Sequence, residues 1–101
     1  MLPGPTRLEG MTADEMQALD LASLGFALNE LAVALAACGT LAIEARRALR
    51  DVIIAKREYA DSEDYKAALE VAKCNRDEVK LRIGTLKELK STLQTIVRAI
   101  P

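Results

Sequence analysis

Apolar positions in residues 12–60 repeat every seven residues along two columns. The first column is Leu24, Leu31, Cys38, Ala45, Val52 and Tyr59, and the second is Leu21, Leu28, Leu35, Ala42 and Leu49. A seven-residue period gathers side chains on one helix face. Thr12 and Glu15 have the spacing of a capping box at a helix start. The pattern therefore predicts one amphipathic helix over residues 12–60.

Gly39 is the one position where this helix has a plausible alternative ending. Gly39 followed by Thr40 suits a helix C-terminus and a new N-cap. The apolar columns, however, keep their phase through Gly39, and one interior glycine costs a helix only ~1 kcal/mol relative to alanine. We favour a continuous helix and keep a three-helix bundle with a break at Gly39 as the alternative.

A second helix is predicted over residues 62–99. The columns stop at Ala60-Asp61-Ser62-Glu63, where Asp61 or Ser62 can cap a new helix. The new apolar column is Tyr65, Ala72, Val79, Leu86, Leu93 and Ile100. Folding the chain back at 60–62 makes an antiparallel hairpin with facing pairs Tyr59–Tyr65, Val52–Ala72, Ala45–Val79, Cys38–Leu86, Leu31–Leu93 and Leu24–Ile100. Ala72 then faces Val52 and Ala45 faces Val79, so that small residues meet larger ones there, as in close-packed seams.

Charge supports the same antiparallel alignment. Residues 45–60 hold five basic and two acidic side chains, and residues 61–79 hold six acidic and three basic ones. Complementary charges discriminate between alignments even where each pair stabilises little. The basic side chains Arg46, Arg47, Arg50 and Arg57 are interpreted as hairpin partners, with a polar contact patch as the alternative.

The stretch from Leu31 to Ile43 contains no charged residue. A helix that is apolar on all sides needs cover on all sides. Thirteen residues are too few for a bilayer, which takes about 20, so no membrane is expected. We expect a homo-oligomeric helix bundle, a dimer being favoured. The predicted interface with a second subunit or protein partner is Leu24, Leu28, Leu31, Leu35, Cys38 and Leu41.

Proline and glycine are dense in residues 1–10, MLPGPTRLEG. These residues disfavour a stable helix. We expect a disordered leader or tag over residues 1–10 and a single helical domain over 11–101.

The composition argues against catalysis. The chain has no histidine, a formal net charge of −1 and two cysteines, Cys38 and Cys74, without metal-ligand spacing. No nucleophile–base pair, carboxylate pair or phosphate loop is recognisable. We expect a non-enzymatic protein with no cofactor and no metal, and a reducing, cytoplasmic location.

The segments AKREYADSEDYKAALEVAK and LKELKSTLQTIVRAI resemble small helical-hairpin proteins encoded by phages. The likeness spans residues 48–100 and implies an accessory or inhibitory role through binding a protein. The leading hypothesis is therefore a protein–protein interaction module. One alternative is a nucleic-acid accessory protein of replication or recombination that uses the four arginines with Lys87, Lys90 and Arg98. Another is an oligomer that binds a nucleotide near Tyr59 and Tyr65.

Overall fold

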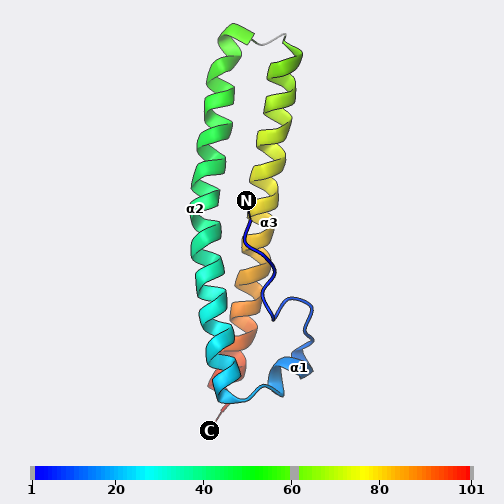
Figure 1. The fold of residues 1–101 in the computed structure, drawn as a ribbon, viewed down its shortest axis with the longest axis vertical. Helices are drawn as coiled ribbons and strands as arrows, with labels where there is room; N and C mark the ends of the chain where they lie inside the picture. Colours follow the sequence, from blue (N-terminus) through cyan, green and yellow to red (C-terminus); the bar gives the residue numbers. More distant parts are fainter. Residues whose placement is uncertain (1, 60–61, 101) are drawn as a thin grey trace.

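The protein is a long antiparallel helical hairpin with a short N-terminal segment folded against one end (Figure 1). The computed structural model describes residues 2–59 and 62–100, and for residues 56–59 only the backbone. Within these ranges the helices are α1 (Ala13–Gln17), α2 (Leu21–Tyr59) and α3 (Glu63–Arg98), and there is no strand. The molecule measures 62 × 19 × 18 Å. The predicted all-α class and the packing of two long helices against each other are confirmed.

The first predicted column of α2 and the predicted column of α3 lie in the seam between the two helices. The residues buried there are Leu24, Leu31, Cys38 and Ala45 from α2, and Ala72, Val79, Leu86 and Leu93 from α3. Val52 and Tyr65 are half-buried, Ile100 is exposed, and the Tyr59 side chain lies outside the described residues. The second α2 column is only partly buried: Leu49 is buried, Leu28, Leu35 and Ala42 are half-buried, and Leu21 is 68% exposed. Burial therefore supports the proposed seam, and the residue-by-residue pairing stays a prediction.

The helix runs through Gly39 without a break, so the three-helix alternative with a turn at that glycine is wrong. Packing of the flanking positions Leu35 and Cys38 into the seam outweighs the cost of ~1 kcal/mol for a glycine inside a helix. The heptad phase predicted this continuity.

The expected single helix from residue 12 is wrong at its N-terminal end. The capping box between Thr12 and Glu15 is present, but α1 stops after Gln17. Asp20 then caps α2, because its Oδ1 accepts the Ser23 N–H at 2.7 Å and its carbonyl accepts the Leu24 N–H at 2.9 Å. A side-chain acceptor at this place competes with helix continuation. Two caps with a bend between them let Met16 fold into the core.

The start of α3 agrees with the prediction. Ser62 is the N-cap, and its hydroxyl accepts the Tyr65 N–H at 3.4 Å. Glu63 and Asp64 add negative charge at the positive end of the helix dipole. Ala60 and Asp61, part of the predicted turn, lie outside the described residues.

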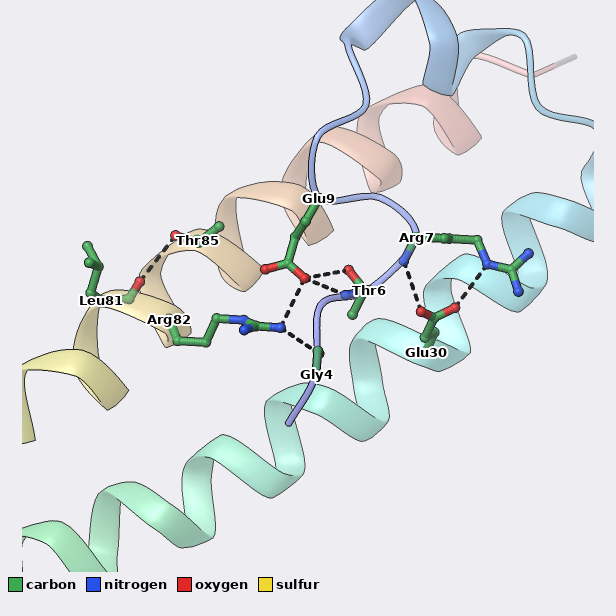
Figure 2. A network of polar contacts seen from close by, with 8 residues as sticks. All are labelled: Gly4, Thr6, Arg7, Glu9, Glu30, Leu81, Arg82 and Thr85. Atoms are coloured by element: carbon green, nitrogen blue, oxygen red, sulfur yellow. Dashed lines mark hydrogen bonds and ion pairs between the residues drawn. The ribbon is translucent and has the colours of Figure 1, made fainter. Parts of the chain in front are cut away.

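The N-terminal residues differ from the expected disordered leader. Residues 2–10 run along the lower half of the hairpin, and Leu8 is 0% exposed within the main apolar cluster (Figure 1). Polar contacts tie the segment to both long helices, as Figure 2 shows. Arg7 pairs with Glu30 of α2 at 3.0 Å, and Arg82 of α3 pairs with Glu9 at 3.0 Å. The segment is rich in proline and glycine and does not form a long helix. Burial of Leu8 and the two ion pairs hold it against the hairpin instead.

Candidate interaction surface

One face of α2 packs against α3. The opposite face of α2 is uncharged and is exposed to solvent. Its members follow the three- and four-residue spacing of a helix stripe. They are Ala22, Gly25, Phe26, Asn29, Ala32, Val33, Ala36, Gly39, Thr40 and Ile43. All of them are exposed except Gly39, which is half-buried. We call this set the outer face of α2.

Large apolar side chains project from the outer face into solvent. Phe26 is 65% exposed, Val33 is 64% exposed and Ile43 is 48% exposed. Scattered surface hydrophobic residues are common, but a contiguous apolar strip usually marks a binding surface. Here the three residues share one stripe with no charged side chain between them.

The only charge between Leu21 and Ile43 is Glu30, and it is engaged by the leader. Its Oε1 accepts the backbone N–H of Arg7 at 3.0 Å, and its Oε2 accepts from the Arg7 guanidinium at 3.0 Å (Figure 2). These contacts, the backbone hydrogen bond first, lower the pKa of Glu30. The leader and α2 also enclose a groove of about 420 Å³, lined among others by Pro5, Phe26 and Val33. The leader therefore forms a wall along one edge of the outer face.

Two glycines of the outer face have no explanation within one hairpin. A Cβ added at Gly25 or Gly39 would meet no heavy atom within 4 Å. An interior helix glycine costs ~1 kcal/mol relative to alanine. Glycine in a helix often marks close approach of another backbone. The surrounding hairpin does not supply that neighbour at either position.

The predicted interface residues divide into two groups. Leu24, Leu31 and Cys38 are buried against α3 and offer no surface to a second subunit in this conformation. Leu28 and Leu35 are half-buried against the core cluster, and Leu41 is also half-buried. The seven-residue period identified the face that packs inside the chain. The outer face has its own helical spacing, which could have been found from the absence of charge at every one of its positions.

The predicted arginine patch is exposed. Arg46, Arg47 and Arg50 surround a shallow depression beside Ile43, and the Arg57 side chain lies outside the described residues. Their expected ion pairs with α3 are absent among the described side chains. Arg46 instead donates to the Ala42 carbonyl at 3.3 Å. Asp77, which shares a groove with Arg46, pairs with Arg76 at 3.0 Å.

The two basic groups invoked for nucleic-acid binding lie on different helices and follow different parts of the hairpin. The arginines occupy the C-terminal half of α2, whereas Lys87, Lys90 and Arg98 follow α3 toward the opposite end (Figure 1). A continuous phosphate-tracking strip needs its cations side by side. The geometry does not bring these groups together.

Over part of its length α2 is also long and apolar enough to cross a membrane. Within Leu21–Ala55 its most apolar window has a mean hydropathy of 1.8, and 22% of that window is buried. Core helices of soluble proteins pass the same test. In this hairpin α3 runs beside α2 with Lys80, Lys87 and Glu88 exposed. Each such charge costs about 2.5–3.5 kcal/mol at a bilayer centre.

The two cysteines differ in their surroundings. Cys38 is buried in the seam, and Cys74 is exposed on α3. Desolvation and the negative charge of Glu70, whose Oε1 lies 3.7 Å from Sγ, raise the pKa of Cys74. Within residues 2–59 and 62–100, no group of three or more acidic or cysteine side chains is placed to hold a metal.

Comparison of the chain with protein-family models, with curated proteins and with solved structures finds no match.

Proposed function

We propose that this protein is a non-enzymatic interaction module whose working surface is the outer face of α2. The observation that supports the proposal most directly is the uncharged strip holding Phe26, Val33 and Ile43 in solvent. Covering apolar surface yields roughly 25 cal/mol per Å². Helical surfaces of this kind bind another helix through residues spaced three and four apart.

The contacts of the leader with both long helices also support the proposal. The leader is tied to α2 through Arg7 and to α3 through Glu9, so a third segment of chain packs against the lower half of the hairpin (Figure 1). A preorganised surface loses less conformational entropy on binding. The leader thus supports the half of α2 that carries Phe26 and Val33. The resemblance to phage hairpin proteins, which implies an accessory role through binding a protein, fits the same role.

Site-specific photocrosslinking tests this function without assuming the partner. A photoreactive benzoylphenylalanine replaces Phe26 in cells that express the full chain. Leu81 of α3, 74% exposed, receives the same group as a matched control. We expect covalent protein adducts from position 26 and few from position 81. Equal labelling from both positions, or none from position 26, would contradict the proposal.

A further inference from the structure

We infer that the outer face of α2 binds the same face of a second copy of this chain, antiparallel, about a two-fold axis between Ala32 and Val33. The inference rests on the proposed function, because it names the partner of that surface. Isologous pairing requires a surface to be complementary to itself. The outer face has this property in residue size and in charge.

Size complementarity is the first argument. With the axis between Ala32 and Val33, every position of the outer face lies opposite another position of the outer face on the second copy. The facing pairs are Ala22 with Ile43, Gly25 with Thr40, Phe26 with Gly39, Asn29 with Ala36, and Ala32 with Val33. Glycine or alanine stands in each pair, so each larger side chain meets a small partner. Such alternation is how close-packed helix layers interdigitate.

The two glycines acquire a role in this arrangement. Gly39 lies where the Phe26 ring of the other copy arrives, and Gly25 lies opposite Thr40. The hairpin leaves open space at both glycines, so no contact inside one chain excludes a larger residue there. Close approach of a second helix does exclude it.

Charge fixes the register. A shift of seven residues in one direction places Phe26 against Arg46 and Gly25 against Arg47, and the opposite shift leaves Ile43 beyond the end of the partner helix. The central register keeps Arg46, Arg47 and Arg50 outside the apolar contact. It brings Arg46, Arg47 and Arg50 to the N-terminal end of the partner's α2, where Asp20 is exposed. The arginines of each copy therefore lie near Asp20 of the other copy, and this contact occurs twice, once on each side of the axis.

The extent of the strip sets the expected affinity. Residues 22–43 span about 33 Å at 1.5 Å per residue, and their single helix face lies at the small end of interfaces that bury roughly 1,200–2,000 Å². We therefore expect a Kd of roughly 1–100 μM, in the range of small interfaces. The dimer should therefore form at the micromolar concentrations that sedimentation and cross-linking use.

A reciprocal size swap tests the contact between Phe26 and Gly39. Phe26→Ala removes the ring and Gly39→Leu fills its place, so each single variant is expected to raise the dimer Kd about tenfold or more, as interface truncations of aromatic residues do. The double variant opposes alanine to leucine and should recover most of the affinity. Leu81→Ala on α3 is the control and should leave the Kd unchanged. Additive loss in the double variant would overturn the assigned pairing.

Cysteine cross-linking tests the orientation. In a Cys74→Ser background, Asn29→Cys and Ala36→Cys are prepared separately and oxidised alone or as a mixture. A disulfide requires Cα atoms within about 7 Å, and identical positions in the antiparallel dimer are about 10 Å apart along the axis. Only the mixture should therefore cross-link. Cross-linking of either variant alone would indicate a parallel pair and overturn the inference.

The remaining outcomes separate this inference from the proposed function. A chain that stays monomeric at concentrations above about 100 μM, the upper end of the expected Kd range, overturns the dimer. Adducts from position 26 to a different protein would then leave the interaction function standing. Flotation of the chain with phosphatidylcholine–phosphatidylglycerol vesicles, lost in Val33→Glu and kept in Leu81→Glu, would assign the face to lipid and overturn both.

Discussion

Arg82 of α3 donates to Glu9 of the leader at 3.0 Å, joining residues 73 positions apart in the chain (Figure 2). The two side chains are 17% and 19% exposed, and the same Arg82 nitrogen donates to the Gly4 carbonyl at 2.8 Å. Glu9 in turn accepts from the backbone and hydroxyl of Thr6. One α3 side chain thus holds the two ends of the leader's turn together.

Replacing Arg82 with methionine should release the leader. Glu9 would keep a mostly buried charge without its guanidinium partner, and losing such a contact costs about 1–3 kcal/mol. Tryptic cleavage after Arg7 is expected to accelerate, because its peptide bond becomes accessible. Lys80→Met, an exposed position nearby on α3, is the control. Unchanged cleavage after Arg7 in the Arg82 variant would show that this contact does not retain the leader.

Leu8→Ala should lower the free energy of unfolding by about 2–4 kcal/mol, as for other fully buried leucines. Leu8 is 0% exposed and packs with Met16 and Leu86 in the same cluster. Leu21→Ala is the matched control, since Leu21 is 68% exposed. Urea denaturation followed by circular dichroism measures both. Equal effects of the two substitutions would mean that the leader does not contribute to the core.

Asp20→Ala should fray the first turn of α2. The Ser23 backbone N–H, followed by its hydroxyl, lowers the pKa of Asp20 below its ordinary value. A lowered folded-state pKa gives stabilisation that is present at neutral pH and is lost as the pH falls through the folded-state value. The protection factors of the Ser23 and Leu24 amides, which correct the exchange rates for the intrinsic effect of pH, should therefore fall in Asp20→Ala at neutral pH, and in the natural chain on acidification. Asp20→Asn, which retains a capping oxygen, should show a smaller effect.

The thiols should react at very different rates. Cys38 is buried, so alkylation there reports opening of the α2–α3 seam. Cys74 is exposed but holds its proton to higher pH than an ordinary cysteine, because desolvation and then Glu70 raise its pKa. The thiolate is the reacting form. Iodoacetamide should modify Cys74 first, and Glu70→Gln should shift its rate–pH profile to lower pH. A profile that Glu70→Gln leaves in place would exclude the Glu70 contribution.

The seam and the start of α3 could be predicted because both depend on local regularities. Leu31, Cys38 and Leu86 belong to seven-residue columns, and Ser62 stands before two acids. The bend before Leu21 was missed, since Ala18 and Leu19 contain no glycine or proline signal. The available signal was Asp20, a strong N-cap residue that the continuing apolar columns obscured.

The leader could not be predicted from its own composition. Its order depends on Glu30 and Arg82, which lie far along the chain and reach Arg7 and Glu9 only after the hairpin forms. Leu24, Leu31 and Cys38, which were predicted to face a partner, are buried inside the hairpin, and the exposed apolar residues of α2 lie on its opposite side. An uncharged stretch from Leu31 to Ile43 indicates surplus apolar surface. Which half faces α3 depends on the packing of α3 itself.

Sedimentation equilibrium of the full chain tests the central claim, that the outer face of α2 pairs with itself. The wild-type protein should show a reversible monomer–dimer equilibrium. Val33→Glu, beside the two-fold axis, should be monomeric at the same concentrations with unchanged helix content, because two glutamates would be brought together in an apolar contact. Leu81→Glu should dimerise like the wild type. A wild-type protein that stays monomeric at concentrations up to about 100 μM, the upper end of the expected Kd range, would contradict the account. A Val33→Glu variant that dimerises with undiminished affinity would also contradict it.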